Sequence, residues 1–225
     1  MAERAEPLVR VRGEATLEVE PEVARLTVLL RARDKDRRRT LDRLTERNQA
    51  CLDLVRRYGE AVEDVDTSGM AITPEVRDGR GERVRAYHGA VRIRITVRDF
   101  AVLGELITLL GDEELATVQG PAWELRPGSP VFDRAAEQAV RAALARARTY
   151  ASALGTEISG VVELADAGLS SHFARDLGYA AAPAAYGGAA AYGAAEPPAL
   201  ALEPETIQVH AVVEATFRIA PPATL

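Results

Sequence analysis

The sequence reads AAEQAVRAALARARTYASALG from Ala135 to Gly155, and alanine occupies five positions of this stretch that are spaced four residues apart. Residues four apart lie on nearly the same side of an α-helix, so this spacing predicts a helix with one ridge of methyl groups. Such a ridge is flat, and we expect a sheet of this chain, another helix or a second subunit to pack closely against it. Charged side chains interrupt the helix and argue against a membrane span: Glu137, Arg141, Arg146 and Arg148.

The residues at both ends of this helix favour the same interpretation. Ser129 is a predicted N-cap, Pro130 follows at the first helical position, and Gly155 lies just beyond the end. The helix is therefore predicted over residues 130–154.

Outside this helix, apolar and polar residues alternate with a period of two, which predicts strands with one buried face. The predicted strands span residues 9–19, 24–30, 67–76, 84–97, 118–125, 158–164 and 207–219. Two further helices are predicted, over residues 34–59 and after the cap residue Asp99. We expect the first two strands to form a hairpin. These elements predict an α+β fold with a largely antiparallel β-sheet and helices packed on one face. Their order repeats two strands followed by a helix, as an internal ββα duplication would produce.

The composition predicts a soluble protein with an aliphatic core. Of 225 residues, 47% are hydrophobic and only 5% aromatic, and the net charge of −6 argues against nucleic acid as a partner. We expect a single domain over residues 1–225, with a low-complexity flexible loop at about 166–204. No apolar run is long enough for a membrane-spanning helix. As written, the N-terminus lacks an apolar leader, which predicts a cytoplasmic protein unless an upstream start codon adds one.

Four more motifs accompany the alanine helix. They are VRGEATLEVEPEVARLTV at 11–28, DVDTSGMAITPEV at 64–76, YHGAVRIRITVRD at 87–99 and IQVHAVVEATFRI at 207–219. With these motifs in this order, the chain from Val9 to Ile219 resembles the SIMPL domain family, which includes bacterial periplasmic and outer-membrane immunogenic proteins.

The resemblance implies an α+β fold and, as in some members, large ring-like homo-oligomers. It also implies a link to oxidative or envelope stress at the level of the family. It implies no established activity, and it supplies no catalytic residues. Family members often carry a secretion signal, which the sequence as written lacks.

No arrangement of residues predicts catalysis or a cofactor. His88 and His210 lie on predicted strands and could meet across a sheet, where a metal site would need a third ligand such as Glu214. No HxxxH, HExxH or CxxC spacing occurs, so we interpret these strand histidines as solvated. The third histidine is His172. The segment GLSSH at 168–172 lacks the second glycine of a nucleophile elbow. We therefore expect no enzyme and no metal site.

The cysteine and the arginines have structural interpretations. Cys51 is the only cysteine, which excludes an internal disulfide, and its place on the apolar side of a helix predicts a buried, inert thiol. Five arginines could form a basic sheet face, but without interleaved aromatic residues we expect them to be solvated and paired with glutamates such as Glu214. They are Arg10, Arg12, Arg92, Arg94 and Arg98.

Two functions stay open at this point. The first is a non-enzymatic protein that assembles into homo-oligomers. The second is a small-molecule or peptide binding module that uses the 166–204 loop as a lid, with Tyr179, Tyr186 and Tyr192 as ligand contacts. The sequence predicts neither the ligand nor the size of the oligomer.

Overall fold

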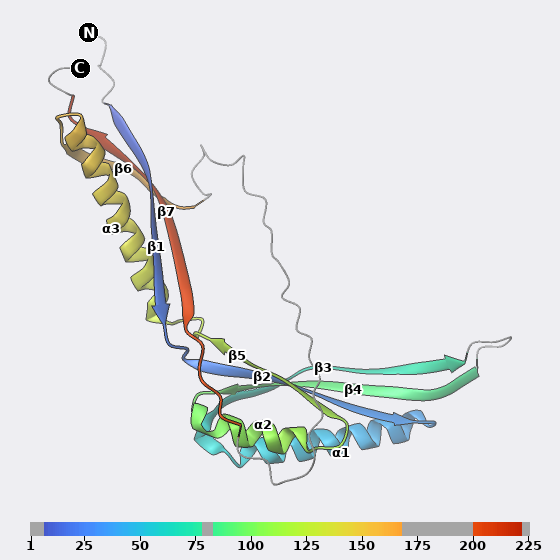
Figure 1. Cartoon of the computed structure of the whole chain (residues 1–225). Coiled ribbons are helices and arrows are strands. Elements are labelled where there is room, and N and C mark those ends of the chain that lie inside the picture. Colours follow the sequence, from blue (N-terminus) through green and yellow to red (C-terminus); the bar gives the residue numbers. More distant parts are fainter. Residues whose placement is uncertain (1–6, 78–82, 168–199, 222–225) are drawn as a thin grey trace. The chain divides into compact units, whose positions relative to one another are not determined.

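The computed structural model describes residues 7–77, 83–167 and 200–221 (Figure 1). In chain order the helices and strands are β1 (Leu8–Val19), β2 (Val23–Asp34), α1 (Arg37–Arg56), β3 (Val62–Arg77), β4 (Arg83–Val97), α2 (Leu103–Gly111), β5 (Ala116–Glu124), α3 (Pro130–Ala153), β6 (Ile158–Asp166) and β7 (Ile207–Ile219). All strand pairs are antiparallel. The predicted α+β fold is confirmed.

These elements form two compact units, each with its own sheet. The three-stranded unit contains β1, β7 and β6 in that spatial order, together with α3. The four-stranded unit contains β3, β4, β2 and β5 in that spatial order, together with α1, α2 and residues 200–206.

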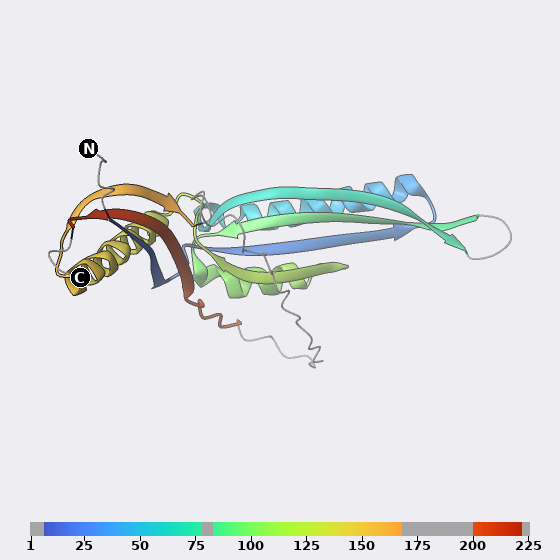
Figure 2. The ribbon, with the colours of Figure 1, turned by 90° about the horizontal axis from the view of Figure 1, so that it is seen from above.

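In the three-stranded unit, α3 packs on one face of the sheet through its alanine ridge (Figure 2). All five ridge alanines are at most 1% exposed, and the last four share a hydrophobic cluster with apolar residues of β1 and β7 such as Val11 and Phe217. The approach is closest at Gly13 of β1, where an added Cβ would lie 2.0 Å from the carbonyl oxygen of Ala139 and 2.7 Å from the Cβ of Ala143. The ridge therefore packs on a sheet of its own chain.

The predicted signals at the ends of α3 are confirmed. The Ser129 side chain accepts a hydrogen bond from the backbone N–H of Val131, and Pro130 is the first helical residue. Gly155 has a φ of +65°, the left-handed conformation that commonly ends a helix. The chain then turns into β6.

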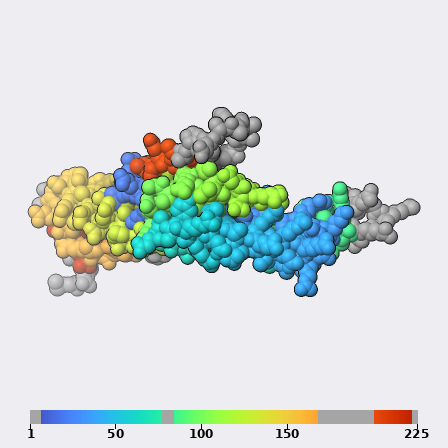
Figure 3. Space-filling model, turned by 90° about the horizontal axis from the view of Figure 1, so that it is seen from below, coloured from blue at the N-terminus to red at the C-terminus, as the bar shows by residue number. Residues whose placement is uncertain are grey.

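In the four-stranded unit, α1 and α2 pack on one face of the sheet, the face that Figure 3 shows. This core is built from large aliphatic side chains, and its fully buried members include Leu26, Leu30, Ile93, Ile95 and Leu106. Asp36 caps α1 by accepting from the N–H of Arg39, and Asp99 accepts from the N–H of Ala101 at the 3₁₀ turn before α2.

The returning chain also belongs to the four-stranded unit. Leu202 packs against the core, and an added Cβ at Gly104 of α2 would lie 2.3 Å from the carbonyl oxygen of Leu200. The glycine therefore allows the segment before β7 to lie directly on α2.

Two expectations from the sequence are wrong. The hairpin between the first two strands does not form, because β1 pairs with β7 whereas β2 pairs with β4 and β5. The described strands form two sheets with two hydrophobic cores instead of one interior. The single domain over 1–225 and the internal duplication stay predictions.

Candidate functional site

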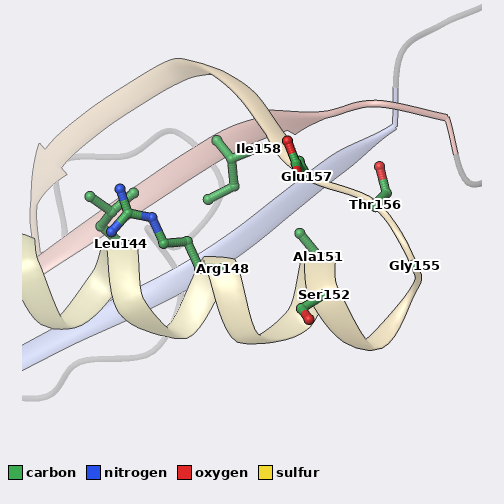
Figure 4. Close-up of a pocket in the computed structure, with 8 residues that line it drawn as sticks. All are labelled: Leu144, Arg148, Ala151, Ser152, Gly155, Thr156, Glu157 and Ile158. Carbon is green, nitrogen blue, oxygen red and sulfur yellow. The ribbon is translucent and has the colours of Figure 1, made fainter.

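A hollow of about 560 Å³ lies between the C-terminal half of α3 and the start of β6 (Figure 4). From α3 it is lined by Leu144, Arg148, Ala151 and Ser152, and the connection to β6 adds Gly155, Thr156, Glu157 and Ile158. It exists because α3 covers β1 and β7 but makes little contact with β6. The hollow is thus the gap between a helix and a strand that it leaves partly uncovered.

Local hydrogen bonds fix the rim of this hollow. The Thr156 N–H donates to the carbonyl of Ala151, and the Thr156 hydroxyl donates to the carbonyl of Ala220 at 2.5 Å. Arg148 is exposed and has no ion-pair partner among the described residues. A guanidinium, a carboxylate and two hydroxyls over aliphatic carbon are suited to binding an acidic or polar group.

A second, shallower hollow of about 250 Å³ lies on the four-stranded sheet. It is lined by Leu29, Gly69, Met70, Ala71, Ala90 and Arg92. Glycine and alanine at neighbouring positions of β3 and β4 leave this dent because they lack long side chains. Arg92 is the only ionisable side chain in its lining.

The two strand histidines lie on different sheets. The Nε2 atom of His88 on β4 lies 2.8 Å from Glu75, whereas the Nδ1 atom of His210 on β7 lies 3.1 Å from the Thr16 hydroxyl. The expectation that they could meet across a sheet is wrong, since β4 and β7 belong to different sheets. Within the described part of the chain, no three His, Cys, Asp or Glu side chains are grouped as metal ligands would be.

The five arginines that could have formed one basic face are divided between the two units, which agrees with the preferred expectation that they are not a joint binding surface. Arg10 and Arg12 lie on β1, whereas the other three arginines lie on β4 or just after it in the other unit. Three of the five pair with carboxylates: Arg12 with Glu214 at 3.5 Å, Arg94 with Asp66 at 3.0 Å and Arg98 with Glu60 at 3.1 Å. The pairing of Arg12 with Glu214 confirms that part of the prediction.

Cys51 is buried in the four-stranded unit, as predicted. Its exposure is 1%, and burial, with a smaller contribution from Glu113, raises the pKa of the thiol to about 11. On the same helix, the buried Oδ1 atom of Asn48 has no hydrogen-bond partner among the described residues. Neither group lines either hollow.

The proposed tyrosine contacts lie outside the described residues. Tyr179, Tyr186 and Tyr192, together with His172 and the GLSSH segment, fall within 168–199. Their role as ligand contacts stays a prediction.

An apolar surface on β6 is not among the features predicted from the sequence. Val161, Val162 and Leu164 are 66%, 47% and 52% exposed, although they lie in a strand. The pairing register with β7 shifts twice along β6, between Ile158 and Gly160 and again between Val161 and Glu163, as it does at β-bulges. Two adjacent valines in the segment ISGVVELAD interrupt the alternation of a half-buried strand, and this is the signal that could have revealed the bulge.

Comparisons with known proteins agree on one family. The SIMPL family model, described as a protein of unknown function, matches residues 9–217. The 26 kDa periplasmic immunogenic proteins of Brucella melitensis and Brucella abortus are each 26% identical over 168 residues, covering 70% of this chain and 66% of the relative. The uncharacterized protein YggE of Edwardsiella ictaluri is 23% identical over 158 residues, covering 69% of this chain and 66% of that protein. The matches thus span just under two thirds of each relative's length.

Proposed function

The chain belongs to the SIMPL family, and on this premise we propose that it is a non-enzymatic protein that acts by assembling with copies of itself. The observation that carries the proposal is the exposed apolar surface on β6, where three of four consecutive side chains are large and hydrophobic. Clustered apolar residues at the edge of a sheet are typical of protein–protein contacts.

The titratable groups support a structural role for the described residues. Hydrogen bonds from Arg126 lower the pKa of Glu63, and hydrogen bonds from Arg33 and then His88 lower the pKa of Glu75. These shifts follow from ion pairs on the four-stranded unit. A carboxyl group whose lowered pKa is explained by a surface ion pair is a poor candidate for acid–base catalysis.

Light scattering on the purified chain tests the assembly. We expect a mass that is a multiple of 24.2 kDa at 50 μM and that falls on dilution. A mass of one chain at every concentration from 1 to 100 μM would contradict the proposal.

A second candidate, a small-molecule binding module, is favoured by the hollow between α3 and β6. Arg148 would pair with an acidic group of the ligand. Native mass spectrometry of the protein after incubation with cell extract should show an added small mass that Arg148→Glu removes. The control is Arg141→Glu, a charge reversal on the same helix at a residue that pairs with Glu137 outside the hollow.

The compartment is a separate question. The cytoplasmic location expected above is untested, and two relatives are named periplasmic. No described helix is both long and apolar enough to cross a membrane. Fractionation of cells that express the gene from its native locus would decide between the two compartments.

A further inference from the structure

The two register shifts of β6 place its apolar residues on one face of the sheet. Three apolar residues of β6 lie directly opposite β7 residues that are buried in the cluster under α3. The pairs are Ile158 with Ile219, Val161 with Phe217 and Leu164 with Ala215. Side chains directly opposite in an antiparallel pair point to the same face, and each shift adds one residue to β6. Every third residue of β6 therefore lies on the α3 face, and we call these three residues the β6 strip.

The β6 strip is only partly covered by the helix. Ile158 packs against the cluster under α3, whereas Val161 and Leu164 are 66% and 52% exposed. Ile158 also lines the hollow between α3 and β6, and Leu144 lines it from the helix side. The strip therefore continues the apolar part of the hollow along β6, as far as Asp166 on the same face. The hollow and the strip together form one groove beside α3.

A guanidinium lies in this groove without a carboxylate. Arg148 lines the hollow, and it has no ion-pair partner in the described part of the chain. Arg141 on the same helix, in contrast, pairs with Glu137 at 3.1 Å. In Figure 4 the guanidinium of Arg148 extends toward Leu144 and away from Glu157, the acidic residue of the lining. An anionic group bound beside Arg148 would therefore meet a positive charge that no described carboxylate neutralises.

We propose that the groove binds a free alkyl carboxylate, with its carboxylate paired to Arg148 and its hydrocarbon chain on the β6 strip. This inference rests on the second candidate function, the binding module, and names the chemical class of its ligand. A guanidinium pairs well with a carboxylate, and the strip beside it offers only aliphatic carbon. An amphiphile with one anionic head matches both features, because its chain and the exposed strip leave water together.

The size of the hollow suits such a ligand. Its volume of about 560 Å³ lies in the range of small-molecule sites. If each non-hydrogen atom takes roughly the 30 Å³ of a water molecule, the hollow holds about nineteen of them. An unbranched carboxylate with a chain of about ten to sixteen carbon atoms is therefore accommodated.

The bound chain would cover side chains that also carry the assembly proposal. Val161 and Leu164 are two of the three exposed apolar residues of β6 on which that proposal depends. A ligand and a second copy of the chain cannot cover the same side chains at once. At this surface the two candidate functions are therefore alternatives.

Calorimetric titration with sodium decanoate, below the concentration at which it forms micelles, tests the head group. The wild-type chain should bind decanoate, and it should bind decyltrimethylammonium, which has the same chain and the opposite charge, at least about tenfold more weakly. Arg148→Gln should weaken decanoate binding at least about tenfold, because a charge-assisted hydrogen bond is lost. Arg141→Gln, on the same helix but outside the hollow, is the control and should bind like wild type.

A charge on the β6 strip tests the place of the chain. Val161→Asp removes an apolar contact and puts a carboxylate beside the hydrocarbon, so decanoate binding should weaken at least about tenfold. The matched control is Val76→Asp on β3 of the other unit, where the valine is 48% exposed, and it should leave the affinity unchanged. Circular dichroism should show that all of these variants are folded, because each replaced side chain is exposed.

The outcomes separate the ligand class from the binding function. If the wild-type chain binds no decanoate but retains another small molecule from cell extract through Arg148, the alkyl carboxylate is overturned while the binding module stands. A chain that retains neither would overturn both.

The remaining outcomes concern the site. Equal affinities for decanoate and decyltrimethylammonium would overturn the role of Arg148. Decanoate binding that survives both Arg148→Gln and Val161→Asp would overturn the groove as its site. An assembly that Val161→Asp dissociates, in a chain that binds no decanoate, would assign the β6 strip to a second copy instead.

Discussion

The two units pack helices on sheets with side chains of opposite size. In the three-stranded unit, α3 presents methyl groups and approaches β1 until the backbone of Ala139 lies over Gly13. In the four-stranded unit, α1 and α2 stand off from the sheet on leucine and isoleucine side chains such as Leu106 and Ile95. The first core should be sensitive to added volume and the second to removed volume.

The largest effect is expected from a cavity in the four-stranded unit. Leu106→Ala should lower the free energy of unfolding by about 4 kcal/mol, because the side chain is fully buried and the surrounding core relaxes only in part. Guanidinium unfolding followed by the fluorescence of Trp123 measures this, since the only tryptophan packs on this core. Leu109→Ala on the same helix, where the side chain is 39% exposed, should cost less than about 1 kcal/mol. Equal losses in the two variants would contradict the interpretation of this core.

The next effect comes from added volume in the three-stranded unit. Gly13→Ala should cost about 3 kcal/mol, because its Cβ would overlap backbone atoms of α3 that cannot rotate away. Unfolding is followed by far-UV circular dichroism, which reports the helices and strands of both units, and Gly160→Ala is the control on the same sheet, since nothing lies within 4 Å of an added Cβ there. A loss below about 1 kcal/mol for Gly13→Ala would show that α3 can move away from the sheet at little cost.

Cys51 probes how tightly the four-stranded core is closed. With its pKa raised to about 11, the thiol at pH 8 has about a hundredfold less thiolate than a free cysteine, so iodoacetamide should react at least that much more slowly. The reference is the rate for the same chain in 6 M guanidinium. A native rate within tenfold of this reference would mean that the core opens readily.

The smallest effect is a pH dependence at the surface of the four-stranded unit. Hydrogen bonds from Arg33 and His88 lower the pKa of Glu75 in the folded chain. Its contribution to stability is therefore present above the pKa of the unfolded chain and is lost as the pH falls through the lowered value. The unfolding midpoints of wild type and Glu75→Gln should differ at pH 7 and converge by pH 3. A difference that persists at pH 3 would assign the effect to packing.

The local features of the fold could be predicted from the sequence. The bounds of β7 agree with the prediction, and those of α3 differ by one residue. These bounds are predictable because helix caps and hydrophobic periodicity depend only on residues a few positions apart in the sequence. The partners of β1 and β2 could not be predicted this way, because an alternating strand has the same pattern whichever neighbour it pairs with. The sequence therefore predicted the elements but placed β1 in the wrong sheet.

The candidate site was less predictable. The hollow depends on how far α3 extends over β6, and Arg148 and Ile158 become neighbours only through that packing. The exposed apolar residues of β6 lie in a predicted strand, but the sequence does not show that this strand is at an edge. The distinction between a core strand and an interface strand needs the order of the strands in the sheet.

The central position of β7 has a consequence for biosynthesis. β7 follows every other described element in the chain, yet it lies between β1 and β6 and supplies much of the surface under α3. When residues 20–126 have left the ribosome, they can already bring β2, β3, β4 and β5 together. β1 and α3, in contrast, must remain without their shared partner until translation passes residue 219, so this half of the nascent protein is the one that chaperones would meet.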